Sequence, residues 1–177
     1  FYFSNVLSKK WSEISPKRFI KKIFYVALSV RIVWVVFSYF FYQGMTGQPF
    51  EFGAADSLFY NDIARYGSGL IADGNLFIAD ELTKYSGGLG FSDQGYPVYL
   101  SFIYFLTGKS ILLARLIKAL WAAWTCVLVY KYASRNFGEP AGRIAAVFCM
   151  LMPNLIYYCG LHLKETEMVF LTVAAVE

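Results

Sequence analysis

Residues 23–42 read IFYVALSVRIVWVVFSYFFY, and Arg31 is the only charged side chain among these 20 residues. An α-helix needs about 20 predominantly apolar residues to cross the hydrocarbon core of a bilayer. Three residues that stop helices follow the stretch, namely Gly44, Gly47 and Pro49. We therefore predict a first membrane span over about residues 22–43 and an integral membrane location for the chain.

The composition of the whole chain agrees with this prediction. Of its 177 residues, 58% are hydrophobic and 20% are aromatic, and the mean hydropathy is +0.47. A soluble domain rarely combines so many apolar residues with so few charges. The sequence therefore predicts an all-α fold, a polytopic transmembrane helical bundle. Because the chain starts at Phe1 without Met and a late apolar run is cut at Glu177, we expect the N-terminal part of a larger membrane protein.

Charged residues are distributed unevenly along the chain. Residues 1–22 carry six basic side chains and one acidic one, whereas residues 44–96 carry seven acidic and two basic ones. Basic segments beside a span stay on the cytoplasmic side. We therefore predict a cytoplasmic, basic and amphipathic segment over 1–21, broken at Pro16, and an outer loop over 44–109. The membrane would be a bacterial inner membrane or the ER, and no nucleic-acid partner is expected.

The outer loop is predicted to contain short juxtamembrane helices. Asp56 to Tyr66 has apolar residues spaced for one helical face, and Gly67-Ser68-Gly69 is expected to end that helix. The glycines that follow make the second half of the loop irregular. The apolar run Tyr96–Thr107 has only 12 residues and is bounded by Pro97 and Gly108, so we expect an interfacial or re-entrant helix on the outer surface.

Later apolar runs predict further spans. They cover about residues 110–134 and 141–161, the latter bent at Pro153, and a fourth starts at 168. This order delivers the net positive loop 131–143 to the cytoplasm, as the charge rule requires. A crossing by Tyr96–Thr107 would invert every later segment.

The outer loop and the end of the third span carry the candidate chemistry. Asp56 follows the first span on the outer side, where a carboxylate can accept a proton from a substrate. The third span delivers His162, Lys164 and Glu165 to the same face. Structural explanations stay open: Asp56 would also serve as a helix cap, and Lys164 and Glu165 as solvated charges in a helix connection.

Three basic residues lie within the apolar runs of the predicted spans (23–42, 110–130 and 144–161), where charges are costly and are usually functional or paired. Arg115 and Lys118 share one helix face and either reach the interface or take part in function. Arg31 lies near the middle of the first span and is expected to pair with a carboxylate or with backbone carbonyls. His162 is the only histidine. It and Glu165 are the candidates for a metal site, and a divalent metal is the one cofactor left open.

Four motifs occur in order along the chain: Ala55-Asp56-Ser57-Leu58-Phe59-Tyr60 with Ala64-Arg65, Gly95-Tyr96-Pro97-Val98-Tyr99-Leu100, Gly108-Lys109-Ser110 with Ala114-Arg115-Leu116, and Pro153 to Tyr158 with Leu163-Lys164-Glu165. Their order over about residues 20–177 resembles the GT-C membrane glycosyltransferases, in particular the protein O-mannosyltransferases and the lipid A aminoarabinose transferases. Two departures stand out. Asp56-Ser57 replaces the common Asp-Glu pair, and Tyr96-Pro97 replaces the usual Pro-Pro.

The resemblance implies a GT-C-like transmembrane domain over 22–177. It implies a polyprenyl-phosphate-linked sugar as donor and a protein, lipid or glycan as acceptor on the outer or lumenal face. Asp56 would be the catalytic base and Glu165 the second acidic residue of the site. Cations must stabilise the leaving phosphate, and the candidates for donor binding are Lys164, Arg115, Tyr60, Arg65 and Lys84.

Two other classes of function remain open. A transporter or flippase for a lipid-linked substrate would place ionisable residues near the bilayer midplane, and Arg31 fits this. The large acidic loop with its interfacial helix fits a transporter poorly, since it places the chemistry at the membrane surface. A non-catalytic membrane scaffold would tolerate replacement of both Asp56 and Glu165.

Overall fold

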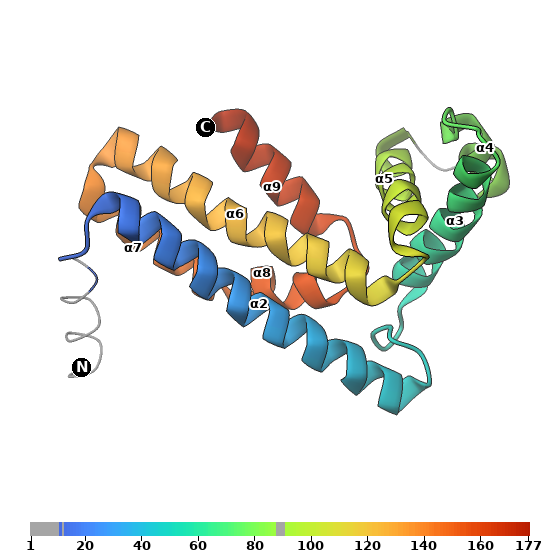
Figure 1. The fold of residues 1–177 in the computed structure, drawn as a ribbon, viewed down its shortest axis with the longest axis horizontal. Coiled ribbons are helices and arrows are strands. Elements are labelled where there is room, and N and C mark those ends of the chain that lie inside the picture. The colour runs from blue at the N-terminus through green and yellow to red at the C-terminus, as the bar shows by residue number, and fades with distance from the viewer. Residues whose placement is uncertain (1–10, 12, 88–90) are drawn as a thin grey trace. The chain divides into compact units, whose positions relative to one another are not determined.

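The computed structural model describes residue 11, residues 13–87 and residues 91–177, and every regular element in these residues is a helix (Figure 1). The all-α class is therefore confirmed for this part of the chain. The residues divide into two compact units. The Arg31 unit comprises the residues up to Trp34, Ala119–Cys159 and Glu165–Glu177, and the Arg115 unit comprises Val35–Lys118 and Gly160–Lys164.

Two helices are long and apolar enough to cross a membrane, α2 (Pro16–Thr46) and α6 (Ile111–Phe137). A third candidate is the pair formed by α7 (Glu139–Leu151) and α8 (Pro153–Tyr157) with the 3-10 turn Tyr158–Gly160, which is bent by 52°. The predicted bend at Pro153 is thus confirmed. The last helix, α9 (Glu165–Val176), begins at Glu165 rather than at 168.

The beginning of α2 differs from the prediction. We expected the span to begin at about residue 22, but its helix already begins at Pro16, directly after the non-helical residues 13–15, so the predicted break at Pro16 is present. Residues 1–10 and 12 of the predicted cytoplasmic segment lie outside the described residues. Proline is favoured in the first helical turn because the amide hydrogen that it lacks would have no helical acceptor there. The basic residues of this segment therefore belong to the same helix as the apolar run: Lys17, Arg18, Lys21 and Lys22.

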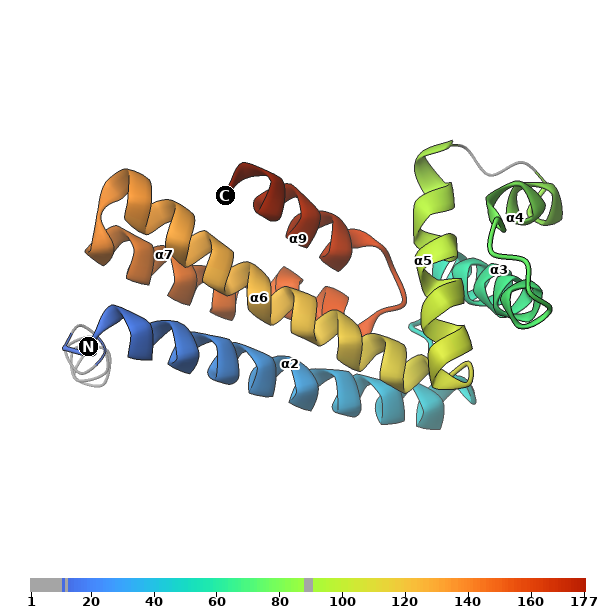
Figure 2. The same cartoon turned by 45° about the horizontal axis from the view of Figure 1, so that its top comes forward.

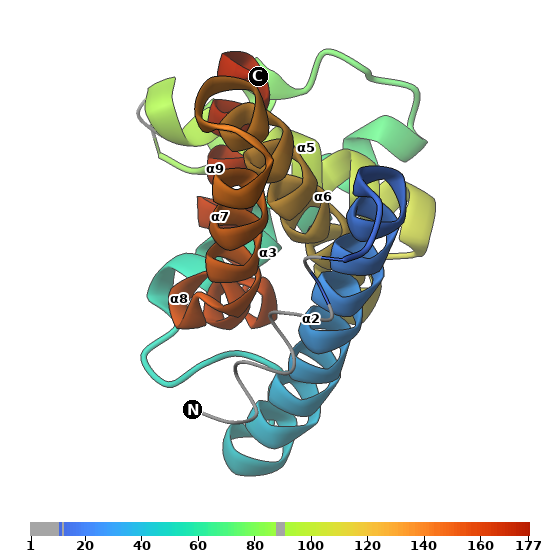
Figure 3. The ribbon, with the colours of Figure 1, turned by 90° about the vertical axis from the view of Figure 1, so that its left-hand side faces the viewer.

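The core of the Arg31 unit lies where α2, α6 and α7 run side by side (Figure 3). Its buried members are mostly small or aromatic: Phe19, Ile23, Ala27, Ala123, Cys126, Val127, Tyr130, Ala146 and Met150. Helices α6 and α7 approach closely, since a Cβ atom on Gly142 would lie 1.8 Å from Ser134 Oγ. Gly138, with a φ of +89°, forms the turn between the two helices.

Arg31 is fully buried in this unit and binds backbone carbonyls. Its Nη1 donates to the carbonyls of Ala27 (3.2 Å) and Met150 (3.4 Å), and its Nη2 donates to that of Cys149 (3.3 Å). Pro153, four residues after Cys149, has no amide hydrogen, so the Cys149 carbonyl has no helical donor. Arg31 supplies the missing hydrogen bond at the break between α7 and α8, which confirms one of its two predicted kinds of partner.

The Arg115 unit contains the three helices of the predicted outer loop, α3 (Ala55–Ala72), α4 (Ala79–Tyr85) and α5 (Phe91–Thr107) (Figure 2). The prediction that α3 ends at Gly67-Ser68-Gly69 is wrong. A Cβ atom on Gly67 would lie 2.2 Å from Ser101 Oγ of α5. Gly67 therefore permits close packing of α3 on α5 instead of ending the helix, and Gly74, with a φ of +90°, follows the true end.

Helix α5 also differs from the prediction, because it begins at Phe91 and continues through Pro97. Three residues at helical spacing on one face, Tyr96, Leu100 and Tyr104, are buried. They join the core of this unit with residues from the loop before α3, from α3 and from the start of α6: Phe50, Ala54, Tyr60, Ala64, Ile111 and Ala114. Burial of this face anchors the 12 residues that the sequence pattern indicates, and the helix begins five residues before them.

Candidate functional site

Three basic side chains are buried together in the Arg115 unit. Arg115 and Lys118 come from the first turns of α6, and His162 comes from the segment 160–164, and each is at most 2% exposed. An uncompensated buried cation is unfavourable, so each of these groups needs hydrogen-bond partners or an anion. The three side chains differ in how many hydrogen-bond partners they have among the described residues.

Lys118 is the best satisfied of the three. Its ammonium donates to Tyr96 Oη (3.1 Å), to the carbonyl of Leu161 (3.0 Å) and to that of Leu163. An ammonium group has three hydrogens to donate, and these acceptors match that number. Two of them flank His162, so Lys118 holds the segment 160–164 against α6 and fixes the position of His162.

Arg115 has no hydrogen-bond partner among the described residues. All three of its guanidinium nitrogens are buried and unpaired. The guanidinium carbon lies 5.7 Å from the centre of the Phe50 ring, and Glu51 attracts the guanidinium electrostatically. A guanidinium offers five N–H donors in a fixed fork that matches phosphate and carboxylate. Arg115 is therefore a buried cation that Glu51 attracts electrostatically and whose N–H donors have no acceptor among the described residues.

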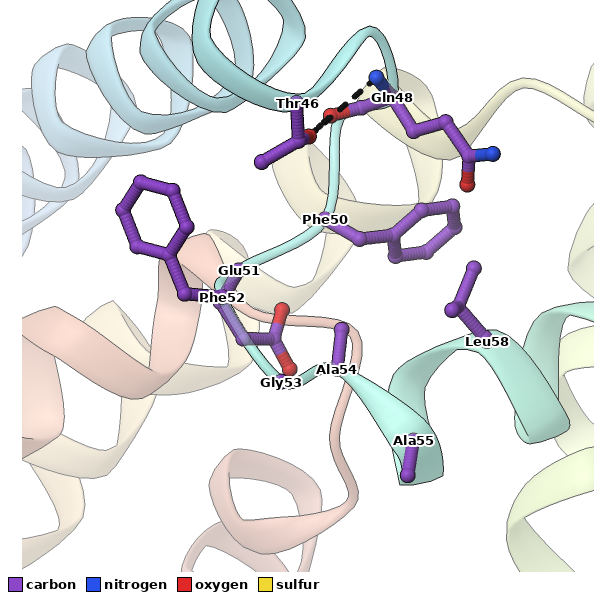
Figure 4. Close-up of a pocket in the computed structure, with 9 residues that line it drawn as sticks. All are labelled: Thr46, Gln48, Phe50, Glu51, Phe52, Gly53, Ala54, Ala55 and Leu58. Atoms are coloured by element: carbon purple, nitrogen blue, oxygen red, sulfur yellow. Dashed lines mark hydrogen bonds between the residues drawn. The ribbon is translucent and has the colours of Figure 1, made fainter.

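Glu51 is a carboxylate that no sequence motif indicated. Ser57 Oγ donates a hydrogen bond to its Oε1, while its Oε2 is buried without a partner among the described residues. It lines an open pocket of about 500 Å³ with Phe50, Phe52, Ala54 and Leu58 (Figure 4). Glu51 thus places a second carboxylate at Ser57, the position where the common Asp-Glu pair is interrupted.

Asp56 is exposed in the first turn of α3. The structural explanation of Asp56 as a cap is wrong, because the cap residue is Ala54 and no side chain caps the helix. A carboxylate in the first turn still interacts favourably with the positive end of the helix dipole. Asp56 lies between Ala55 and Leu58, which line the 500 Å³ pocket, but does not line it itself.

The other donor-binding candidates in the outer loop have partners. Tyr60 is buried in the core, with its ring edge-on to Tyr96 at 5.1 Å between centroids. Arg65 is exposed and its Nε donates to Asn61 Oδ1 (3.4 Å). Lys84 forms an exposed ion pair with Glu81 (3.0 Å), and the hydrogen bond to Glu81 raises the pKa of Lys84.

The remaining candidates lie near the start of α9. Lys164 is half-buried at the end of the segment 160–164, in the Arg115 unit. Glu165 is half-buried as the first residue of α9, in the Arg31 unit, and its Oε2 is buried without a partner among the described residues. A site shared by Asp56 and Glu165 stays a prediction. Among the described residues no group of three or more His, Cys, Asp or Glu side chains is placed to hold a metal ion.

His162 belongs to a buried hydrogen-bonded chain. Its Nε2 lies 3.0 Å from Tyr104 Oη, and Tyr104 Oη donates to Asn61 Oδ1 (2.8 Å). Burial, followed by the nearby charges of Lys118, Arg115 and Arg65, lowers the pKa of His162 well below 6.5, and burial raises the pKa of Tyr104. His162 is therefore neutral near pH 7. Sequence pattern gave no signal for Tyr104 or Asn61, since each looks like an ordinary residue of an amphipathic helix.

No protein-family model, curated protein or solved structure matches this chain. The chain is therefore classified by the physical features of its fold and of its candidate site. The described chain is a helical protein with two helices long and apolar enough to cross a membrane. Next to the start of the second of these helices it buries a basic cluster, in which the guanidinium of Arg115 has no hydrogen-bond partner among the described residues.

Proposed function

We propose that this protein is a membrane glycosyltransferase that moves a sugar from a polyprenyl-phosphate donor to an acceptor on the outer or lumenal face. The observation that carries the proposal is the buried guanidinium of Arg115, which has no hydrogen-bond partner among the described residues. A phosphodiester at the membrane interface supplies the negative charge and the acceptor oxygens that this group lacks. The resemblance of the motifs around Asp56 and Arg115 to GT-C glycosyltransferases supports the same function.

The reaction needs a base and a stabilised leaving group. The acceptor oxygen or nitrogen forms a bond to the anomeric carbon, and its proton passes to the carboxylate of Asp56. The bond between the anomeric carbon and the phosphate oxygen breaks, and its electron pair leaves with the polyprenyl phosphate. Arg115 stabilises the negative charge that develops on this phosphate. Asp56 suits the role of base because its exposed carboxylate is open to an acceptor.

The other candidate residues take secondary roles in this proposal. Lys164, in the Arg115 unit, would add positive charge near the phosphate, and the role of Glu165 as the second acidic residue stays a prediction. Tyr60 supports the site through its packing on Tyr96, while Arg65 and Lys84 already bind Asn61 and Glu81. A divalent metal held by Glu165 or His162 stays a prediction. The acceptor would be a protein, lipid or glycan, in a bacterial inner membrane or the ER with the N-terminus in the cytoplasm.

The alternative of a transporter or flippase loses the support of Arg31. Arg31 favoured it as an ionisable residue within a span, but the carbonyls at the break between α7 and α8 bind this guanidinium. Arg31 therefore has a structural explanation that needs no substrate. The buried cation left for a substrate is Arg115, which lies in the first two turns of α6 and not at its middle.

The test replaces Asp56 by Asn in the intact protein. Asn keeps the size of the side chain but cannot accept the proton, so sugar transfer should fall by roughly 10²- to 10⁴-fold. Asp80→Asn is the matched control, because Asp80 is also an exposed aspartate in the first turn of a helix, α4. Transfer of a radiolabelled sugar from a polyprenyl-phosphate donor gives the rate. Equal rates for Asp56→Asn and Asp80→Asn would remove Asp56 from the catalytic role.

A further inference from the structure

The direction of each hydrogen bond around His162 can be assigned from chemistry alone. Asn61 Oδ1 faces Arg65 Nε, which can only donate, and Asn61 Nδ2 faces Asp62 Oδ1 (3.3 Å), which accepts. The amide orientation is therefore fixed, and Asn61 Oδ1 is an acceptor. Tyr104 has a single hydroxyl proton, and it donates that proton to Asn61 Oδ1.

This assignment fixes the tautomer of His162. Because the proton of Tyr104 is used for Asn61, the contact between Tyr104 Oη and His162 Nε2 needs a proton from the histidine. The neutral ring then carries its hydrogen on Nε2 and leaves Nδ1 as a bare acceptor. A cationic ring is disfavoured because burial and the charges of Lys118, Arg115 and Arg65 oppose a second proton.

The acceptor Nδ1 is buried and has no partner among the described residues. Unpaired buried polar atoms are rare in folded proteins, and each one calls for an explanation. The Phe50 ring lies close to both unpaired groups of the site. Its centre is 5.7 Å from the guanidinium carbon of Arg115 and 6.0 Å from the centre of the His162 ring. Phe50 also lines the 500 Å³ pocket.

An anion alone would satisfy only half of this site. Phosphate oxygens match the N–H donors of Arg115, but Nδ1 of His162 requires a hydrogen-bond donor. We infer that His162 Nδ1 accepts a hydrogen bond from a hydroxyl of the same ligand whose phosphate binds Arg115, so that the site recognises a phosphate-linked sugar as a unit. The inference rests on the proposed function and adds a residue that selects the sugar-bearing donor over the bare lipid phosphate.

Two substitutions separate the two nitrogens of His162. The amide of glutamine reaches the position of Nε2 and can still donate to Tyr104 Oη, but it leaves nothing at Nδ1. The amide of asparagine reaches the position of Nδ1 and retains an acceptor there, but it loses the contact with Tyr104. His162→Gln therefore removes the proposed ligand contact, and His162→Asn keeps it.

The probes are undecaprenyl phosphate and a panel of undecaprenyl-phosphate hexoses, with binding to the intact protein measured in lipid nanodiscs. We expect the native protein to bind at least one hexose form more tightly than undecaprenyl phosphate. His162→Gln should weaken binding of that hexose form by roughly tenfold, which corresponds to the loss of one hydrogen bond. It should change the affinity for undecaprenyl phosphate by no more than about twofold, and His162→Asn should retain most of the preference for the hexose form.

A second measurement avoids any variant that folds poorly. In the native protein labelled with ¹⁵N-histidine, the Nδ1 resonance should show an unprotonated nitrogen, and it should shift when the hexose form binds but not when undecaprenyl phosphate binds. An Nδ1 that carries the proton, or that is unmoved by the hexose form, would overturn the inference.

The remaining outcomes separate the inference from the proposed function. If His162→Gln loses affinity equally for both probes, or for neither, His162 does not contact the sugar, while the proposed phosphate site at Arg115 would stand. Preference for the hexose form that depends on His162, without any transfer of sugar, would support the inference and reject the glycosyltransferase. Binding of neither probe by the native protein would reject both.

Discussion

Arg31 and Arg115 lie on the two helices that are long and apolar enough to cross a membrane, and both are fully buried. They differ in what surrounds the guanidinium. Arg31 donates to the carbonyls of Ala27, Cys149 and Met150, whereas Arg115 has no hydrogen-bond partner among the described residues. Burial of a charge is costly in both places. Hydrogen bonds to carbonyls offset that cost for Arg31, whereas Arg115 has the electrostatic attraction of Glu51 and the Phe50 ring. A buried arginine with its own acceptors has a structural explanation, whereas the missing acceptors of Arg115 are the basis of its proposed role in binding.

The largest expected effect concerns the ligand of Arg115. Replacement of Arg115 by Met should weaken binding of undecaprenyl phosphate by roughly 10²-fold, since two charge-assisted hydrogen bonds are lost. The free energy of unfolding should stay the same or rise, because an unpaired charge is removed from a buried position. Titration of the lipid phosphate into the intact protein measures the first quantity, and denaturant unfolding measures the second.

The control for this experiment is Lys84→Met, which removes an exposed cation of the same unit that already pairs with Glu81. Lipid binding should be unchanged in this variant, because exposed ion pairs contribute little. If Arg115→Met binds like the native protein and unfolds more easily, Arg115 would be structural and the contrast with Arg31 would disappear.

A smaller effect, on stability, is expected at Arg31. Arg31→Met should lower the free energy of unfolding by about 1–3 kcal/mol, because the Cys149 carbonyl is left without a donor, and it should not change lipid binding. Pro153→Ala would restore an amide hydrogen for that carbonyl. In the Pro153→Ala background the cost of Arg31→Met should therefore shrink, which a double-mutant cycle measures. If Arg31→Met lowers the free energy of unfolding equally in both backgrounds, the hydrogen bond from Arg31 to the Cys149 carbonyl is not the source of its stabilising effect.

The smallest effect is a pH dependence that originates at His162. The pKa of His162 is lowered well below 6.5 by burial and by the cations Lys118, Arg115 and Arg65. Below pH 6.5 the unfolded chain binds a proton at this residue and the folded chain does not, so the free energy of unfolding falls as the pH decreases. The slope is at most about 1.4 kcal/mol per pH unit for one group.

Unfolding of the native protein and of His162→Gln between pH 7.5 and 5.5 tests this dependence. The difference in unfolding free energy between the two proteins should shift in favour of the variant as the pH falls. A shift in favour of the native protein would show that His162 is protonated when folded. In that case Nδ1 would be a donor, and the pairing of His162 with a sugar hydroxyl would be excluded as well.

Several features of the fold could be predicted from local sequence. The first candidate span over 22–43, the second over 110–134 and the bend at Pro153 follow from apolar composition and from a residue without an amide hydrogen. The existence of a helix from Asp56 onward follows in the same way. The end of that helix could not be predicted in this way, because Gly67 permits close contact with Ser101, which lies 34 residues further along the chain.

The candidate site likewise contains residues that local sequence indicated and contacts that only the fold creates. Sequence pattern selected Arg115 as a cation in an apolar helix and Asp56 as a carboxylate beside a span. It did not select Glu51, which reaches Ser57 only because the loop turns back on the start of α3. It also did not predict that Lys118 would bind the carbonyls on either side of His162, since that contact joins residues more than 40 positions apart.

The sequence by itself determined that the chain is helical, that two of its helices are apolar and long enough to cross a membrane, and which charges interrupt the apolar runs. Hydropathy is a sum over neighbouring residues, so it can be read without knowledge of the fold. Only the tertiary structure decided which buried cation is satisfied and which histidine nitrogen is left bare. A hydrogen-bond partner depends on the approach of distant segments, and the packing of α3, α5, α6 and the segment 160–164 brings those segments together.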